Sequence, residues 1–171
     1  MGYKSLGEYL QRLEEEGELI RVKRKINKDT ELMPLVRWQF RGLTKEQRKA
    51  FWFDNVVDAK GRKYDMPVVV GILGASRKIY ALAMGTTVDQ ISKVWERAQL
   101  HPVDPVLVQT GSVKKVIHRE ADLLKEGGGM DLLPTPISLP GFDPAPYLSA
   151  PCMVSKDPDT GIRNVGTYRG M

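Results

Sequence analysis

The chain has 171 residues, of which 42% are hydrophobic and 27% are charged, and its formal net charge is +5. This length suits one domain, or one domain and part of a second, and the composition is that of a folded protein rather than a disordered one. No apolar run approaches the ~20 residues that cross a bilayer, and the charged, amphipathic N-terminus is unlike a secretory signal. The single cysteine, Cys152, excludes an internal disulfide and a cysteine-cluster metal site. We therefore expect a cytoplasmic protein with no membrane span.

The positive charge lies early in the chain. Residues 1–100 carry 19 Lys and Arg against 13 Asp and Glu, whereas residues 101–171 carry 7 against 8. The densest basic run, RVKRK at 21–25, would suit nucleic acid or another acidic surface. It also suits a solvated strand edge whose lysines discourage pairing with other chains. We favour the strand edge and expect no nucleic-acid partner, because no aromatic residues interleave with the charges for stacking on bases.

Up to about residue 110 the sequence predicts helices mixed with short strands. The helix signals are capping boxes and apolar residues at helical spacing, and the strand signals are short apolar runs bounded by Gly, Pro and Asp. In chain order we predict a helix from Ser5 to Gly17, a strand over 19–26, a helix from Asp29 or Thr30 to Phe40, strands over 50–53 and 67–73, a helix from Ser76 to Gly85, and a helix from a Thr87 capping box to His101-Pro102. This order predicts an α/β (α+β) fold whose N-terminal mixed-sheet domain spans residues 1–110.

The composition changes after Pro105. We predict strands at 106–108 and 113–118 and a short helical turn at 120–124. The stretch GGGMDLLPTPISLPGFDPAPY, residues 127–147, is too rich in Gly and Pro for a helix or a central strand, so it predicts a surface loop. Apolar residues between its prolines favour an ordered loop over a disordered linker. Residues 148–155 and 162–169 flank KDPDTG and predict a β-hairpin.

The second strand of this hairpin carries an unusual set of polar groups. Strict alternation would place Asn164 and Arg169 on opposite faces. Because Gly inside a strand often marks a bulge, a bulge at Gly166 would bring Arg169 to the side of Asn164. With the Thr167 hydroxyl and exposed backbone N–H groups, Arg169 would then suit a phosphate or a carboxylate. On these grounds alone, an arginine on a terminal strand is more often a solvated edge charge.

The segment DPDTGIRNVGTYR, preceded by DLLPTPISLPGFDPAPYLSA, closely resembles the UbiD family of (de)carboxylases, which use prenylated flavin mononucleotide (prFMN). The earlier segments GELIRV, FDNV and YDMPVVVGILGASRKIYALAMG resemble it too, so the resemblance covers essentially the whole chain. The chain departs from the family pattern in two places. GGG at 127–129 lengthens the loop, and APYLSAP replaces the commoner GPY form, and both changes bear on loop shape more than on chemistry.

The resemblance implies roles for the closing strand. Asn164 matches the family's metal-binding Asn, where a divalent ion, typically Mn2+, bridges protein oxygens and the flavin phosphate, and K+ is a further candidate ion. An amide oxygen suits such hard cations. The cofactor-contacting residues would be Asn164, Val165, Gly166, Thr167, Tyr168 and Arg169. Arg169 matches the catalytic Arg, which would orient the substrate carboxylate through paired N–H donors.

The family's metal-binding His and Glu, and its proton-transferring Glu–Arg–Glu/Asp network, have no counterpart in the chain. His101 and His118 precede the motif and match no ligand position. The resemblance implies a split β-barrel that holds the flavin, so we expect residues 111–171 to form only its first strands. Such a chain would be inactive alone.

The resemblance also implies partners. They are a missing C-terminal UbiD region or a split subunit, a flavin prenyltransferase that supplies the cofactor, a small carboxylic acid as substrate, and further copies in a homo-oligomer. The complete protein would remove or add CO2 on an aromatic or α,β-unsaturated carboxylic acid. The alternative is a non-catalytic scaffold subunit of a multisubunit carboxylase.

Overall fold

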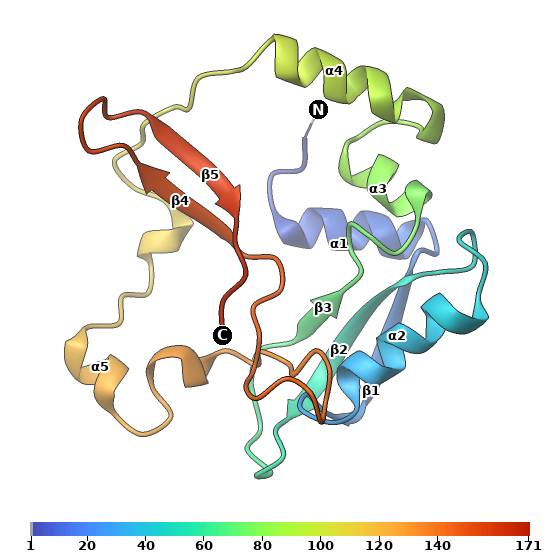
Figure 1. Cartoon of the computed structure of the whole chain (residues 1–171), viewed down its shortest axis with the longest axis vertical. Helices are drawn as coiled ribbons and strands as arrows, with labels where there is room; N and C mark the ends of the chain where they lie inside the picture. The colour runs from blue at the N-terminus through green and yellow to red at the C-terminus, as the bar shows by residue number, and fades with distance from the viewer. Residues whose placement is uncertain (1) are drawn as a thin grey trace. The chain divides into compact units, whose positions relative to one another are not determined.

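The computed structural model describes residues 2–171 and has an α/β fold (Figure 1). The α-helices are α1 (Leu6–Glu15), α2 (Leu32–Gly42), α3 (Arg77–Ala83), α4 (Ile91–Leu100) and α5 (Glu120–Leu124). The strands are β1 (Leu19–Asn27), β2 (Ala50–Val57), β3 (Val68–Val70), β4 (Cys152–Lys156) and β5 (Arg163–Thr167), and short 3-10 turns lie at Val88–Gln90, Ser112–Lys114 and Gly129–Leu132. Across residues 2–171, no helix combines the length and the apolar character that crossing a membrane requires.

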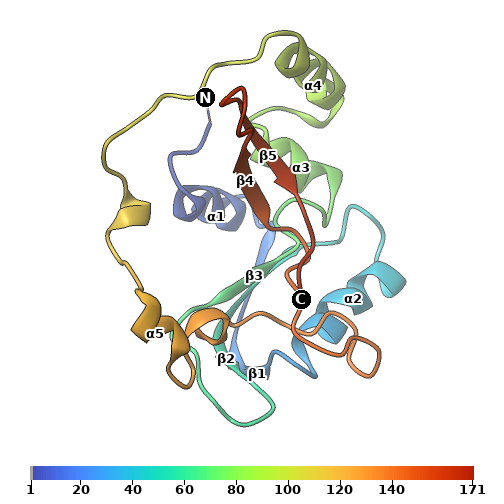
Figure 2. The ribbon, with the colours of Figure 1, turned by 60° about the vertical axis from the view of Figure 1, so that its left-hand side comes forward.

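Two sheets are present in the described chain. The first has the strand order β1-β2-β3, so β2 is central, as the two ribbon views show (Figures 1 and 2). The second is the antiparallel hairpin of β4 and β5. The chain divides into two compact units, and the division runs through the strands of the first sheet. Unit 1 comprises Met1–Arg21, Leu43–Trp52 and Val69–Leu133, and unit 2 comprises Val22–Gly42, Phe53–Val68 and Pro134–Met171.

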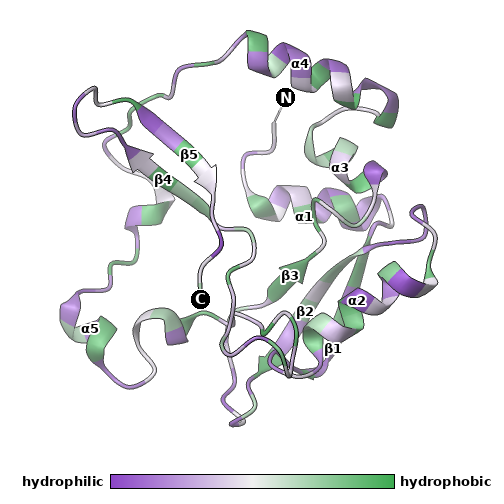
Figure 3. Cartoon of the chain, viewed as in Figure 1, coloured by the Kyte–Doolittle hydropathy of each residue, from purple (hydrophilic) through white to green (hydrophobic). Residues whose placement is uncertain are grey.

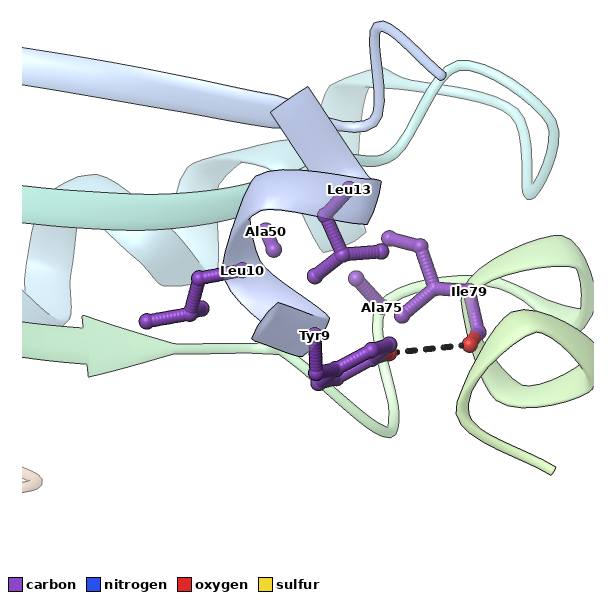
Figure 4. Close-up of a cluster of buried hydrophobic side chains, with 6 residues drawn as sticks. All are labelled: Tyr9, Leu10, Leu13, Ala50, Ala75 and Ile79. Carbon is purple, nitrogen blue, oxygen red and sulfur yellow. Dashed lines mark hydrogen bonds between the residues drawn. The ribbon is translucent and has the colours of Figure 1, made fainter. Parts of the chain in front are cut away.

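The core of unit 1 forms around α1. As the sequence predicts, the Ser5 hydroxyl caps this helix by accepting the Glu8 N–H at 3.2 Å, and Gly17 follows it with a φ of 66°. The buried side chains of the cluster are Tyr9, Leu10, Leu13, Ala50, Ala75 and Ile79 (Figure 4). The Tyr9 hydroxyl lies 3.1 Å from the Ile79 carbonyl, and burial, with a smaller contribution from Tyr3, raises its pKa to about 12. This hydroxyl therefore stays protonated and acts as a donor that ties α1 to α3.

A buried carboxylate adds a second link within unit 1. Glu18 is 4% exposed, and its Oε1 accepts hydrogen bonds from Lys49 Nζ at 3.0 Å and Lys78 Nζ at 2.9 Å. Burial disfavours the ionised form, but the hydrogen bonds from Lys78 and Lys49 outweigh it, so the pKa of Glu18 lies below its ordinary value. Glu18 thus joins the end of α1, the start of β2 and α3.

The helix over 91–100 in unit 1 is amphipathic, and hydrophilic and hydrophobic residues alternate along it (Figure 3). Its buried residue is Ile91, and Trp95 donates from Nε1 to the Tyr80 hydroxyl at 2.6 Å. The predicted Thr87 capping box is wrong, because Thr87 caps no backbone N–H; a 3-10 turn precedes the helix instead. The predicted end at His101 is confirmed.

Unit 2 has its own apolar residues, which α2, β1 and β2 supply: Ile26, Leu32, Val36, Phe53 and Val56. The helix α2 begins later than Asp29 or Thr30, because the Asp29 carboxylate bonds elsewhere. Its Oδ2 accepts the Ala59 N–H at 2.9 Å and its Oδ1 pairs with Lys28 Nζ at 2.6 Å. These contacts direct the Asp29 carboxylate toward Ala59 and Lys28 instead of the first turn of the helix.

The Gly/Pro-rich segment is an ordered loop, as predicted. Ile137 donates its N–H to the Lys28 carbonyl at 3.3 Å, and Lys28 in turn donates to the Val57 carbonyl at 2.8 Å. Within the loop, the Leu139 N–H bonds to the Asp143 carboxylate at 2.6 Å. The loop is therefore fixed to the ends of β1 and β2 by backbone hydrogen bonds.

The strands predicted at 106–108 and 113–118 are wrong. Residues 102–108 have no regular structure, and a 3-10 turn covers Ser112–Lys114. Val106 and Val113 are 85% and 88% exposed. β-branched residues favour a strand only where a neighbouring strand pairs with them, and within residues 2–171 no strand pairs with this segment.

The basic run at 21–25 belongs to β1, and two of its charges contact other side chains. The Arg21 guanidinium lies 4.6 Å from the Trp52 ring centroid, and Arg24 pairs with Glu31 at 3.4 Å. These contacts agree with a strand-edge role. The absence of a nucleic-acid partner stays a prediction.

The Glu18 network predicts an acid-sensitive component of stability. Because the folded-state pKa is depressed, the stabilisation is fully present above the unfolded pKa, near 4.5, and is lost as pH falls through the lower folded value. We expect Glu18→Gln to lower the free energy of unfolding at pH 7 by about 2 kcal/mol and to flatten its fall below pH 4.5. Urea denaturation between pH 3 and 7 measures both effects.

Glu15→Gln is the matched control, since the Glu15 side chain is 55% exposed in its pairing with Arg12. It should change stability by less than about 0.5 kcal/mol. Equal losses in the two variants would show that the Glu18 network contributes nothing specific.

Candidate functional site

The candidate site begins at the turn between β4 and β5. Asp157 donates its N–H to the Ile162 carbonyl at 2.9 Å, and its Oδ1 accepts the N–H groups of Asp159 and Thr160 at 2.9 and 2.6 Å. Hydrogen bonds from the Thr160 backbone and side chain, and from the Asp159 backbone, hold the pKa of Asp157 below its ordinary value. Gly161 has a φ of 74°, which favours glycine. The predicted hairpin is confirmed, and its turn is closed by this aspartate.

The turn sets the pairing of the two strands, which places side chains on two faces. The pairs are Lys156–Arg163, Ser155–Asn164, Val154–Val165, Met153–Gly166 and Cys152–Thr167. Paired residues share a face and successive residues alternate. Asn164 therefore shares its face with Ser155, Met153 and Gly166, whereas Val165 and Thr167 lie on the other face.

The pairing continues regularly through Gly166, so the predicted bulge at this glycine is wrong. Gly166 serves another purpose. A Cβ added there would collide with Tyr168 Cε2 and would come within 2.9 Å of Cζ and 3.0 Å of the hydroxyl. The absent side chain therefore lets the Tyr168 ring lie over the strand, on the face that carries Asn164.

The outer edge of β5 offers backbone donors. The Asp157 N–H bonds to Ile162, and the Tyr168 N–H bonds to the Pro151 carbonyl at 3.3 Å. Inward and outward groups alternate along an antiparallel strand, so Asn164 and Gly166 direct their N–H groups toward β4. Val165 and Thr167 direct theirs outward. In the part of the chain that the structure describes, no further strand pairs with this edge.

The orientation of Arg169 depends on a shift in register beyond the strand. Leu148 and Gly170 form a bridge with hydrogen bonds of 2.8 and 3.2 Å in the two directions. Between this bridge and the Cys152–Thr167 pair, residues 149–151 lie opposite Tyr168 and Arg169, so the β4 side has one extra residue. The irregularity therefore lies beside Arg169 rather than at Gly166. The guanidinium lies 6.0 Å from the Tyr147 ring centroid.

Both halves of the chain match models of one family. Residues 10–98 match the 3-octaprenyl-4-hydroxybenzoate carboxy-lyase N-terminal domain, and residues 107–171 match the Rift-related domain of the same carboxy-lyase. The chain belongs to the UbiD family.

Relatives and solved structures agree with this assignment. Phenolic acid decarboxylase of Sedimentibacter hydroxybenzoicus is 32% identical, over 98% of this chain and 34% of its own length. An evolved dimeric form of the UbiD-class enzyme HmfF from Pelotomaculum thermopropionicum, solved with prFMN, has a TM-score of 0.78 and 30% identity over 98% of this chain and 35% of its own. Vanillic acid decarboxylase ShVdcCD of S. hydroxybenzoicus, in open form with truncated ShVdcD, has a TM-score of 0.76 and 29% identity over 99% of this chain and 36% of its own. The chain spans about a third of the length of these UbiD relatives.

The residues present fit a UbiD metal and flavin site only in part. Within residues 2–171 no group of three or more His, Cys, Asp or Glu side chains could hold a metal ion. Asn164 is exposed and offers one amide oxygen, and the Ser155 hydroxyl lies on the same face opposite it. The outward N–H groups of Val165 and Thr167 suit phosphate oxygens. This hairpin can thus supply one metal ligand and several anion donors.

Two neighbours of the UbiD motif residues were not predicted from the sequence, Ser155 beside Asn164 and Tyr147 beside Arg169. Ser155 could have been found by counting outward from the Asp157–Ile162 turn, because the loop length sets the pairing with Asn164. Tyr147 could not be paired with Arg169 in this way, because the extra residue among 149–151 breaks the count. It becomes visible only in the structure.

The contact between Gly166 and Tyr168 predicts a coupled pair of substitutions. Gly166→Ala should displace the Tyr168 ring, change the near-UV circular dichroism and lower the free energy of unfolding by about 1 kcal/mol. In a Tyr168→Ala background the same substitution should cost close to nothing, since the obstructing ring is gone. Equal costs in both backgrounds would show that the ring does not occupy the space above Gly166.

Proposed function

We propose that this chain is the N-terminal part of a UbiD-like decarboxylase or carboxylase. The complete protein would use prFMN to remove or add CO2 on an aromatic or α,β-unsaturated carboxylic acid. Residues 111–171 would contribute the first strands of the split barrel that holds the flavin, after an N-terminal α/β domain over residues 1–110. The chain alone would be inactive.

The observation that carries this proposal is the exposed hairpin on which the UbiD motif lies. Val154 and Val165 form a cross-strand pair on one face and are 65% and 63% exposed. On the other face Met153 and Tyr168 are 42% and 58% exposed. A two-stranded hairpin is at best marginally stable by itself. Apolar residues on both faces and an unpaired strand edge favour packing and pairing with further strands. Further barrel strands would cover it, and a C-terminal UbiD region or a separate subunit would provide them.

The relatives support the flavin cofactor. HmfF has been solved in complex with prFMN and with FMN. In the complete protein, the Asn164 amide oxygen would be one ligand of Mn2+, and the N–H groups of Val165 and Thr167 would face the phosphate. K+ is a further candidate ion. When bound, prFMN would supply the electron sink for losing or adding CO2.

Arg169 would orient the substrate carboxylate. Its planar guanidinium can donate two parallel hydrogen bonds to a carboxylate. Among residues 2–171, no acidic side chain forms an ion pair with it. Its N–H donors would therefore be ready for a substrate rather than engaged by Asp or Glu of this region.

The proposed partners follow from the same assignment. A flavin prenyltransferase would make the cofactor, and the protein would act as a cytoplasmic homo-oligomer. ShVdcCD is named for more than one subunit, which supports a partner chain as one way to complete the site. The competing proposal is a scaffold subunit that keeps the fold without catalysis.

Replacing Arg169 distinguishes the proposed enzyme from the competing proposal of a non-catalytic scaffold subunit. In the complete protein, produced together with a flavin prenyltransferase, Arg169→Ala should lower kcat/KM for decarboxylation by about 100-fold, the loss expected for a charge-assisted pair worth ~3 kcal/mol. Arg163→Ala is the matched control, because Arg163 is an exposed arginine of β5 on the face opposite Asn164. A scaffold subunit would keep full turnover in both variants, and that result would refute the catalytic role.

Replacing Asn164 tests the metal and cofactor site without relying on turnover. Asn164→Ala should reduce the Mn2+ and prFMN retained after purification by at least about 10-fold, because the proposed metal ligand is lost. Metal analysis and the cofactor's absorbance measure the two quantities, and Arg163→Ala should retain both. Unchanged retention in Asn164→Ala would remove Asn164 from the proposed site.

A further inference from the structure

The Arg169 side chain needs a support that the strand does not provide. β5 ends at Thr167, and Arg169 lies where the register shifts, so strand alternation no longer determines its direction. The residue is exposed. A free arginine side chain has about 2 kcal/mol of rotamer entropy, and binding a carboxylate in one geometry would cost much of it. A contact that already restricts the guanidinium would reduce this cost.

The Leu148–Gly170 bridge brings such a contact into reach. Its hydrogen bonds of 2.8 and 3.2 Å fix the residues on either side of it. In an antiparallel pair centred on this bridge, Tyr147 and Arg169 are diagonal neighbours, a spacing that long and aromatic side chains span. The guanidinium carbon indeed lies 6.0 Å from the Tyr147 ring centroid, at the usual limit for a cation–π contact.

Tyr147 is itself held in place from the opposite side. Its N–H donates to the Pro136 carbonyl at 3.1 Å. The residue after Pro136, Ile137, donates its own N–H to the Lys28 carbonyl. A series of backbone hydrogen bonds thus leads from the end of β1 through the Gly/Pro-rich loop to the backbone of Tyr147, from which the ring extends. The two fixed prolines at 134 and 136 make this part of the loop stiff.

The kind of contact matters as much as its presence. An ion pair with Asp or Glu would restrict Arg169 but would occupy the N–H edge that a substrate needs. An aromatic ring attracts the guanidinium through its π-face, so paired N–H donors can stay directed elsewhere. An aromatic partner is therefore compatible with carboxylate binding in a way that an acidic partner is not.

We propose that Tyr147 is a positioning residue that holds the guanidinium of Arg169 ready for a substrate carboxylate. This inference rests on the proposed function, in which Arg169 binds that carboxylate. It assigns the APY segment a role in the chemistry of the site. The ring is what acts, and the phenol hydroxyl is not required.

The test measures carboxylate binding in the complete, prFMN-loaded protein. The probes are benzoate and cinnamate, and the flavin absorbance change on titration gives Kd. Tyr147→Leu should raise Kd about fivefold, the effect of losing a cation–π contact at a partly exposed site. Tyr147→Phe should stay within about twofold, because it keeps the ring. Phe142→Leu is the matched control, since Phe142 is an 82% exposed ring of the same loop, and it should leave Kd unchanged.

A double-mutant cycle separates positioning from a structural role. In an Arg169→Lys background, which keeps the charge but loses the planar fork, Tyr147→Leu should add less than about twofold. Additive effects would show that Tyr147 acts on the fold and not through Arg169, and so would a Tyr147→Phe variant as weak as Tyr147→Leu. Either result overturns the inference and leaves the proposed function intact. If Arg169→Lys does not weaken binding, or neither probe binds the wild-type protein, the carboxylate role of Arg169 fails, and the inference fails with it.

Discussion

The turn between β4 and β5 determines which side chains of the closing hairpin can act together. Asp157 closes it through its own backbone and through the N–H groups that its carboxylate accepts, and the left-handed Gly161 completes it. A shift of one residue in this turn would exchange the two faces of β5. Asn164 would then lose Ser155 as its cross-strand neighbour, and Gly166 would lose Met153. The chemistry of the hairpin therefore depends on a short aspartate turn that takes no part in it.

The region around α1 and the later part of the chain differ in how much of their apolar surface they bury. Around α1, the side chains of Leu13 and Ile79 are fully buried, and Glu18 is paired with two lysines. In contrast, Val106 and Val165 remain mostly exposed. Exposed valines are unfavourable in water, and under the proposed function further strands of the complete protein would cover them. This contrast agrees with the length comparison, in which the chain spans about a third of its UbiD relatives.

The sequence predicts those features whose signals are local. The Ser5 cap, the glycine after α1 and the KDPDTG turn each involve residues a few positions apart, and all three form as expected. The strands at 106–108 and 113–118 fail because a strand exists only with a partner, and apolar composition cannot supply one. The predicted helix start at Asp29 is wrong for a related reason. The Asp29 carboxylate accepts a hydrogen bond from the N–H of Ala59, which lies 30 residues away in the sequence.

The candidate site shows the same division. The family motif selects Asn164 and Arg169 as candidate site residues, and the turn length predicts the cross-strand neighbours of β5 as far as Thr167. Beyond that point one extra residue among 149–151 changes the count, and the partner of Arg169 depends on the Gly/Pro-rich loop. This loop bonds to Lys28, the residue after β1, and the Lys28 N–H bonds to the carbonyl of Val57 at the end of β2. The backbone of Tyr147 is thus linked through this loop to the end of a sheet more than a hundred residues earlier in the sequence. The contact between Arg169 and Tyr147 therefore depends on residues that no local sequence signal connects.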